Sequence, residues 1–321
     1  MTDRVLVTGA AGFIGSHVSE ALVQGGTEVV GIDNFDPLLY PRAAKERNLA
    51  ALRTNGRFRF VEGDIARDPL PIDGCSVVVH LAAKAGVRPS LADPVAYTET
   101  NVIGTARVLD VARRAGVRRV VFASSSSVYG DTTAAPFAED APAVEPISPY
   151  GATKRAGELL AFSCAAHFGL RIACLRFFTV YGPRQRPDLA IHTMTALTLR
   201  GQPVLMFGDG SSARDYTYIS DAVAGVLAAL EWTGRGGPEA RVFNIGGGAP
   251  VRLDRMMAVL GEALGRPLTV ERRPDQPGDV RLTAADMRRA RAELGYQPAV
   301  KVDEGIRHFV RWYEEVHGRQ R

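Results

Sequence analysis

The chain has 321 residues, of which 46% are hydrophobic and 23% are charged, a balance typical of a folded globular protein rather than a disordered one. The formal net charge is +4, and the lysines and arginines are scattered rather than gathered in one run. The densest basic group, Arg288, Arg289 and Arg291, has the pattern of an exposed helix face. We therefore expect no nucleic-acid partner.

Cysteine usage and hydropathy narrow the class of protein further. Cys75, Cys164 and Cys174 have no metal-ligand spacing, and their odd number predicts reduced thiols and no metal site. No apolar run approaches the ~18 residues that a membrane-spanning helix needs, and the N-terminus enters a strand pattern directly. These features predict a cytoplasmic protein with no membrane partner.

Short apolar, β-branched runs alternate with helical patterns through the first half of the chain. The runs cover residues 5–7, 28–32, 58–62, 77–81, 119–123 and 171–175. This alternation predicts an α/β fold in which helices cover a Rossmann-type, doubly wound parallel sheet.

Beyond Gly182 the alternation loosens, because glycine- and proline-rich connections become frequent. We expect a nucleotide-binding domain over residues 1–180 and a smaller α/β substrate-binding domain over residues 181–321. Segments around residues 215–245 are expected to return to the first domain, so the boundary is not a single cut.

A glycine-rich turn follows the first predicted strand and leads into an amphipathic helix. Gly9, Gly12 and Gly15 allow a tight turn in which the backbone approaches a pyrophosphate closely. The helix that begins near Phe13 and Ile14 is expected to supply N–H donors and positive potential at its N-terminus. This context predicts a dinucleotide site.

Acidic residues at two strand ends support the dinucleotide prediction. Asp33 ends the second strand, 18 residues after Gly15, where a carboxylate accepts the hydroxyls of an adenosine ribose. It would repel a 2′-phosphate, so we expect NAD rather than NADP, with Asn34 beside it. Asp64 and Ile65 follow the next strand and are expected near the adenine. The alternative is that both carboxylates only cap loops.

Tyr150 and Lys154 are four residues apart, and Ser148 and Pro149 before them have the pattern of an N-cap and a first helical residue. On a helix this spacing places both side chains on one face. A phenol that works as a base at neutral pH needs its pKa lowered from ~10, at a cost of about 4 kcal/mol, and a nearby ammonium supplies part of that. The spacing alone is common, but beside a nucleotide turn it indicates a proton acceptor.

Taken together, four motifs resemble those of the extended short-chain dehydrogenase/reductase superfamily. They are Gly9-x-x-Gly12-x-x-Gly15, Leu81-Ala82-Ala83, the serine run before Val128-Tyr129-Gly130, and Tyr150-x-x-x-Lys154. The resemblance covers nearly the whole length. Within the superfamily the chain is most similar to nucleotide-sugar 4-epimerases, and among these to UDP-glucuronic acid 4-epimerases.

Longer segments carry the finer resemblance. Residues 80–88 resemble the family's HLAAQAGVR, with Lys84 in place of the glutamine, and residues 176–183 match RFFTVYGP. Residues 186–190 resemble RPDMA, residues 214–219 resemble RDFTYI, and residues 276–280 match a segment that lies near the nucleoside in the family.

The resemblance implies a mechanism and a set of contacts. Tyr150 takes the proton of the sugar 4-hydroxyl, Ser125 hydrogen-bonds the same oxygen, and Lys154 supports the phenolate. Hydride passes from carbon 4 to NAD, the 4-keto sugar turns over, and the hydride returns to its opposite face, so NAD is regenerated. The implied NAD contacts further along the chain are Leu81, Ala82, Ala83, Lys84, Tyr150 and Lys154. The implied UDP-sugar contacts are Arg88, Ser125, Ser126, Ser127, Thr179, Arg186, Arg214 and Asp279.

The residues after Ser125 separate epimerisation from related reactions. Related dehydratases carry an Asp–Glu pair there, and related decarboxylases carry a glutamate, whereas Ser126 and Ser127 cannot do that acid–base work. With Thr179 and Arg186 they can hold a carboxylate at carbon 5, which favours UDP-glucuronate as substrate.

Several alternatives remain open at this point. A 4-epimerase for UDP-glucose and UDP-galactose, a UDP-glucuronate decarboxylase, and a catalytically inactive nucleotide-sensing protein use the same motifs. A structural role for Arg88 is as good an interpretation as a binding role. Helical patterns after Asn101 and after Tyr150 offer apolar faces, and relatives pair such helices, so we expect a homodimer.

Overall fold

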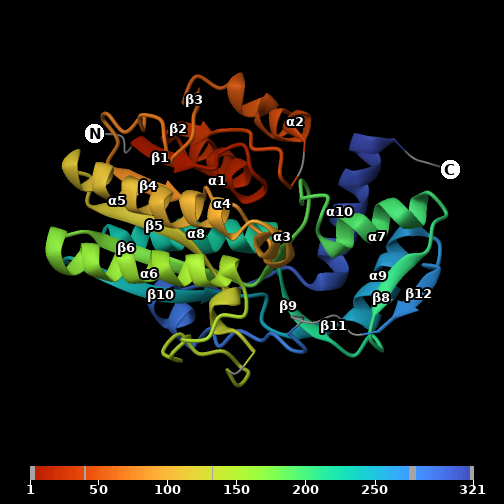
Figure 1. Cartoon of the computed structure of the whole chain (residues 1–321). Helices are drawn as coiled ribbons and strands as arrows, with labels where there is room; N and C mark the ends of the chain where they lie inside the picture. Colours follow the sequence, from red (N-terminus) through yellow and green to blue (C-terminus); the bar gives the residue numbers. More distant parts are fainter. Residues whose placement is uncertain (1–3, 40, 132, 275–279, 319–321) are drawn as a thin grey trace.

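The computed structural model describes residues 4–39, 41–131, 133–274 and 280–318 (Figure 1). Its main feature is a seven-stranded sheet with the strand order β10-β6-β5-β4-β1-β2-β3, in which every neighbouring pair is parallel. The strands are β1 (Arg4–Thr8), β2 (Glu28–Asp33), β3 (Phe58–Glu62), β4 (Val77–His80), β5 (Arg119–Ser125), β6 (Arg171–Phe177) and β10 (Glu239–Ile245). The predicted Rossmann-type sheet is confirmed.

Alternate residues of each strand feed two cores on opposite faces of this sheet. On one face Val5 and Val7 pack with α1 (Phe13–Gln24) and α8 (Ile219–Thr233). On the other face Leu6 packs with α5 (Gly104–Arg114) and α6 (Pro149–Phe168). The near-continuous apolar runs of the sequence are therefore explained by burial on both sides, as parallel sheets require.

All six predicted strand runs are found, and their ends agree within two residues. β4 ends at His80 rather than residue 81, while β5 and β6 continue through Ser125 and Phe177. The two extensions pair with each other, Ser124 with Arg176 and Ser125 with Phe177. The polar residues at the end of β5 join the sheet because the backbone of β6 extends alongside them and provides their hydrogen-bond partners.

Smaller elements lie beyond one end of the large sheet (Figure 1). β7 (Thr179–Tyr181), β9 (Ala213–Tyr218) and β11 (Pro250–Arg252) form a three-stranded sheet, and β8 (Val204–Phe207) pairs in parallel with β12 (Val270–Arg273). The helices of this region are α7 (Ala190–Leu199), α9 (Leu253–Leu264) and α10 (Val302–His317).

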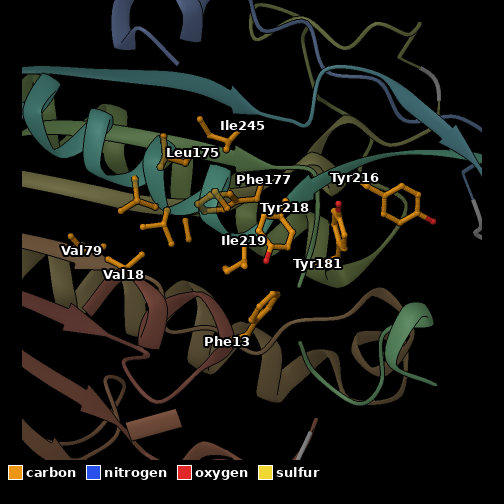
Figure 2. Packing of buried hydrophobic residues seen from close by; sticks show 14 of the residues in the cluster. Phe13, Val18, Val79, Leu175, Phe177, Tyr181, Tyr216, Tyr218, Ile219 and Ile245 are labelled. Atoms are coloured by element: carbon orange, nitrogen blue, oxygen red, sulfur yellow. The ribbon is translucent and has the colours of Figure 1, made fainter. Parts of the chain in front are cut away.

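One hydrophobic cluster runs from the large sheet into the smaller one. Figure 2 shows Phe177 at the end of β6, followed by Tyr181, Tyr216 and Tyr218 of the three-stranded sheet. The ring of Tyr181 packs edge-on against Tyr216 and Tyr218, with centroids 5.9 and 5.5 Å apart. This shared core fixes the smaller elements over the carboxyl ends of the parallel strands. No helix in the described part of the chain is long and apolar enough to span a bilayer.

Candidate active site

A cavity of about 460 Å³ opens at the carboxyl ends of the parallel strands. It lies where β1 has β4 on one side and β2 on the other, the place at which the strand order reverses. Open parallel sheets bind ligands at this kind of switch point, because the connecting helices diverge there. The walls come from the glycine turn, the ends of β2, β4 and β5, the start of α6 and the segment 177–189.

Two glycines of the turn, Gly9 and Gly15, have no room for a side chain. A Cβ added to Gly9, whose φ is +72°, would lie 2.8 Å from the backbone nitrogen of Ala82, and one added to Gly15 would lie 2.0 Å from the carbonyl oxygen of Gly9. Gly12 is the N-cap of α1 and, having no side chain, leaves the first turn of the helix uncapped. The N–H groups of that turn therefore point at the cavity, which suits a phosphate group.

Asp33 is the most constrained carboxylate of the cavity. It is 7% exposed and accepts hydrogen bonds from the backbone nitrogens of Ala11 (3.2 Å) and Phe35 (2.8 Å) and from Lys45 Nζ (3.1 Å). A carboxylate has about four lone-pair positions, so one position stays available for a ribose hydroxyl.

Sequence reasoning missed Lys45, which is 8% exposed and also lines the cavity. A signal existed, because the buried positions of α2 (Arg42–Arg53) are Lys45, Asn48, Leu49 and Leu52, a helical spacing that places the lysine on the inner face. Its ammonium balances the charge of Asp33 and weakens the repulsion of a 2′-phosphate that we expected from the carboxylate alone.

The N-cap at Ser148 and the first helical position at Pro149 are confirmed. Ser148 Oγ accepts a hydrogen bond from the backbone nitrogen of Gly151 at 3.1 Å. Tyr150, the second residue of α6, donates its backbone N–H to Ser90 Oγ at 3.1 Å, and its ring packs edge-on against Tyr97. The catalytic candidate is therefore held at both its backbone and its ring.

Lys154 and Ser125 line the same cavity as Tyr150. Lys154 is 4% exposed, and its Nζ donates to the carbonyl oxygen of Ala123 at 2.7 Å, 6.0 Å from the centre of the Tyr150 ring. Burial lowers the pKa of Lys154 to about 7. The Ser125 hydroxyl, at the end of β5, lies 3.2 Å from Ser127 Oγ.

The electrostatics of Tyr150 differ from our sequence-based expectation. Burial raises the pKa of the phenol, and the hydrogen bond to Ser125 and the charge of Arg186 lower it in part. The ammonium of Lys154 is turned toward Ala123, so it does not set the pKa of the phenol by itself. A half-buried phenol in this setting needs a further positive charge before it loses its proton at neutral pH.

The predicted sugar contacts divide into two groups. Ser126, Ser127, Thr179 and Arg186 line the cavity. Arg186 makes a two-pronged ion pair with Asp188, with N–O distances of 2.9 and 2.8 Å, a partner that sequence reasoning missed.

The remaining predicted contacts lie elsewhere. Arg88 is exposed and lies with its guanidinium 5.6 Å from the centre of the Phe207 ring. Arg214, on β9, donates to the carbonyl oxygen of Ala213 at 3.1 Å. Neither residue lines the cavity. Asp279 lies outside the described residues.

A buried ion pair supports the helix that carries Tyr150 and Lys154. Glu158, one turn further along α6, is fully buried and accepts two hydrogen bonds of 2.8 Å from Arg176 on β6 and one of 2.6 Å from Ser124 Oγ. The pair ties α6 to β6 and to the residue before Ser125. Sequence reasoning did not find this pair, because its partners are far apart in the chain.

Comparisons with known proteins agree with this geometry. Residues 5–246 match the model of the NAD dependent epimerase/dehydratase family, and the chain belongs to this family. It is 37% identical over 97% of its length to a UDP-glucuronate 4-epimerase of Thermodesulfobacterium geofontis, of which 96% is covered. It is 41% identical over 96% of its length to UDP-glucuronate 4-epimerase 4 of Arabidopsis thaliana, of which 75% is covered.

A solved structure shares the same fold over nearly the whole chain. The UDP-glucuronic acid 4-epimerase of Bacillus cereus, in complex with UDP-glucuronic acid and NAD, superposes with a TM-score of 0.91 at 38% identity. The match covers 98% of this chain and 99% of that protein.

Proposed function

We propose that this chain is an isomerase, an NAD-dependent UDP-glucuronate 4-epimerase that interconverts UDP-glucuronate and UDP-galacturonate through a 4-keto sugar. One observation carries the proposal: the cavity that begins at the glycine turn ends at Ser125, Tyr150 and Lys154. Relatives that bear this name over their full length support the choice of substrate.

The described residues fit a dinucleotide. The cradle at Gly9 and Gly15 admits no Cβ, the first turn of α1 is uncapped, and Asp33 keeps an acceptor position. We propose that Asn34, Asp64, Ile65 and Leu81 to Lys84 complete the NAD site, since all of them line the cavity. A dinucleotide held by these residues would supply hydride transfer to and from carbon 4 of the sugar.

We assign the proton transfer to Tyr150. Its phenol is half-buried at the cavity wall, so a sugar hydroxyl next to it is shielded from bulk water. Ser125 donates to or accepts from the same oxygen, and a general base in this geometry contributes typically 10²- to 10⁴-fold in rate. Lys154 keeps the positive charge of the site close to the phenolate, and a bound oxidised nicotinamide would add the further charge that the half-buried phenol needs.

The sugar side must prevent a side reaction. A 4-keto glucuronate is a β-keto acid, which loses carbon dioxide when the breaking bond aligns with the carbonyl π system. We propose that Ser126, Ser127, Thr179 and Arg186 hold the carboxylate away from that alignment, since all four face the cavity. Arg214, Arg88 and Asp279 are proposed to contact the UDP group beyond it.

The ion pair between Arg186 and Asp188 favours a second candidate function. Because Asp188 balances its charge, the cavity is less cationic than the arginine alone would make it. A 4-epimerase of neutral UDP-hexoses is therefore the alternative. A decarboxylase or dehydratase is disfavoured, since Ser126 and Ser127 carry no acid–base group. A nucleotide sensor without activity would not need Ser125, Tyr150 and Lys154 together.

We propose further that residues 1–180 hold the cofactor while residues 181–321 hold most of the UDP-sugar, and that two copies pair through α6. The α6 side chains Leu159 and Phe162 are 54% and 41% exposed, and Ile103 before α5 is 49% exposed. A pair of such apolar surfaces supports a homodimer. Cys75, Cys164 and Cys174 are free thiols, which supports a cytoplasmic location.

The experiment that tests the proposed activity supplies the purified protein separately with UDP-glucuronate and UDP-glucose and resolves the products by NMR. We expect UDP-galacturonate to form from UDP-glucuronate without carbon dioxide release. A clear preference for UDP-glucose would establish the alternative, and no conversion of either sugar would refute an epimerase.

A further inference from the structure

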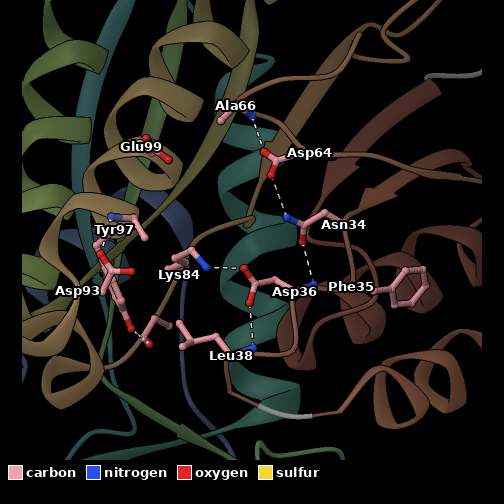
Figure 3. Close-up of polar contacts among 12 residues, drawn as sticks. Asn34, Phe35, Asp36, Leu38, Asp64, Ala66, Lys84, Asp93, Tyr97 and Glu99 are labelled. Carbon is pink, nitrogen blue, oxygen red and sulfur yellow. Dashed lines mark hydrogen bonds and ion pairs between the residues drawn. The ribbon is translucent and has the colours of Figure 1, made fainter.

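Two loops face each other across the nucleotide end of the cavity. The first follows β2 and contributes Asn34, Asp36, Leu38 and Leu39 to the wall, and the second follows β4 and contributes residues 81–87. One ion pair joins the loops: Lys84 Nζ donates to Asp36 Oδ2 (Figure 3). The resemblance to the family places a glutamine at position 84, so this charge belongs to the present chain.

Asp36 is held firmly on its own loop. Its Oδ1 accepts the backbone N–H of Leu38 at 2.8 Å, and its own backbone N–H donates to Asn34 Oδ1 at 3.0 Å. Asn34 Nδ2 in turn donates to Asp64 Oδ2 at 3.1 Å, so this series of hydrogen bonds continues to the loop after β3 (Figure 3). Burial alone would raise the pKa of Asp36, but the hydrogen bond from Lys84 and the N–H of Leu38 hold it below its ordinary value.

Lys84 is fixed from the other side by its backbone. Asn101 accepts the N–H of Lys84 at 2.8 Å and donates to its carbonyl oxygen at 2.9 Å. The same amide donates to Thr153 Oγ1 on α6 at 3.0 Å. The ammonium therefore reaches Asp36 from an anchor that is shared with the helix of Tyr150 and Lys154.

We propose that the Lys84–Asp36 ion pair is a clasp that slows the release of the nicotinamide dinucleotide from the cavity. This inference rests on the proposed function in one respect, that the occupant is NAD. Both loops line the nucleotide end of the cavity, and the ion pair joins them while the side chains of Lys84 and Asp36 are 18% and 29% exposed. A dinucleotide that left between these loops would have to break the pair.

Slow release of the cofactor matters in a reaction without net redox change. The cofactor that is reduced in the first half of the cycle has to be the same molecule that reduces the keto sugar in the second half. If the reduced cofactor left in between, the keto sugar would remain without a hydride donor, and the cycle could not be completed. Slow release therefore protects each cycle.

The expected size of the effect follows from the exposure of the pair. Exposed ion pairs contribute up to ~1 kcal/mol, and partly buried ones contribute more. Removal of the pair should therefore speed NAD release by roughly three- to tenfold.

The test measures release directly, without any sugar. The protein is loaded with NAD, passed over a desalting column, and mixed with ethanol and alcohol dehydrogenase, so that free NAD appears as NADH fluorescence. The variants are Lys84→Met, Asp36→Asn, the double variant, and Lys84→Gln, which keeps a hydrogen bond without the charge. The matched control is Arg67→Met, which removes one positive charge from the exposed Arg67–Glu99 pair, outside the cavity wall.

We expect Lys84→Met, Asp36→Asn and the double variant to release NAD faster than the parent by a similar factor. The release rate of Lys84→Gln should fall between theirs and that of the parent, and Arg67→Met should release NAD at the parental rate. Release of NAD at the parental rate from Lys84→Met and Asp36→Asn would overturn the clasp, even if the parent epimerises. If these variants release NAD rapidly but the parent converts no UDP-sugar, the clasp is supported and the epimerase is refuted. A parent that holds no NAD would refute both.

Discussion

The two sides of the cavity are built in different ways. On the cofactor side, backbone groups and buried charges leave little freedom: Gly15 has no room for a methyl group, and the side chains of Lys45 and Asp33 are 10% and 6% exposed. On the sugar side, longer side chains come from loops, and Arg186 and Asp188 are 17% and 31% exposed. The difference suits an epimerase, in which the cofactor stays fixed while the sugar ring turns over.

The largest effect should come from filling the glycine turn. Gly15→Ala places a Cβ 2.0 Å from a backbone oxygen, which cannot move aside, so we expect a loss of more than about 4 kcal/mol in the free energy of unfolding or no NAD binding. Denaturant unfolding and calorimetric NAD titration measure both. Gly56→Ala is the control, because nothing lies within 4 Å of its added Cβ. Normal NAD binding by Gly15→Ala would show that the cofactor side of the cavity tolerates a side chain and is not rigid.

The next effect should come from the ion pair beneath α6. Glu158→Gln leaves Arg176 buried with an uncompensated charge, and the loss of one partner of such a pair costs about 3–5 kcal/mol. We expect a fall of this size in the free energy of unfolding. Arg155→Met, which removes a more exposed partner of the same carboxylate, should cost far less. Equal losses for the two variants would contradict the structural role assigned to Arg176.

On the sugar side, a change should alter selectivity and leave the cofactor in place. Arg186→Ala removes a charged hydrogen-bond donor, so we expect kcat/KM for UDP-glucuronate to fall about 10- to 100-fold and carbon dioxide release to rise. NAD retention should change little, and UDP-glucose turnover should fall less than UDP-glucuronate turnover, because the loss of this charge also raises the pKa of Tyr150. Unchanged UDP-glucuronate epimerisation without extra carbon dioxide would exclude a role for Arg186 in holding the carboxylate.

The smallest effect concerns the pH dependence of stability on the cofactor side. His80 lies between Thr8 Oγ1 (2.7 Å) and Thr105 Oγ1 (3.0 Å), and burial, with help from the charge of Lys154, lowers its pKa to about 3. The unfolded chain takes up this proton below about pH 6.5, whereas the folded protein does not until about pH 3. Stability should therefore fall as the pH falls through this window.

Replacement of the imidazole isolates that contribution. In His80→Gln we expect the slope of the unfolding free energy against pH to flatten by up to ~1.4 kcal/mol per pH unit between pH 6 and 4. The exposed His167→Gln is the control. A parental slope in His80→Gln would show that His80 takes up its proton without unfolding the site.

Local sequence patterns were enough to predict most of the fold but only part of the site. The strands and the cap at Ser148 were predictable, because β-branched runs and an N-cap with proline are signals over a few residues. The pairing of β8 with β12 was not, since it joins segments more than 60 residues apart through tertiary packing.

The same limit applies to the charges of the cavity. Tyr150 and Ser125 were found from their motifs, but Lys45 beside Asp33, Asp36 beside Lys84 and Glu158 beside Arg176 each join different elements of the fold. The rise in the pKa of Tyr150 could not be predicted either, because burial and the orientation of the Lys154 ammonium depend on those tertiary contacts.

We propose that a cofactor held by one side of the cavity and a sugar held by the other react at the phenol of Tyr150. The most direct test is Tyr150→Phe, with UDP-glucuronate conversion and bound NAD measured on the same preparation. We expect conversion to fall about 10²- to 10⁴-fold while NAD stays bound, because only the proton acceptor is removed. Conversion within a few-fold of the parent, with NAD bound, would show that Tyr150 is not the proton acceptor.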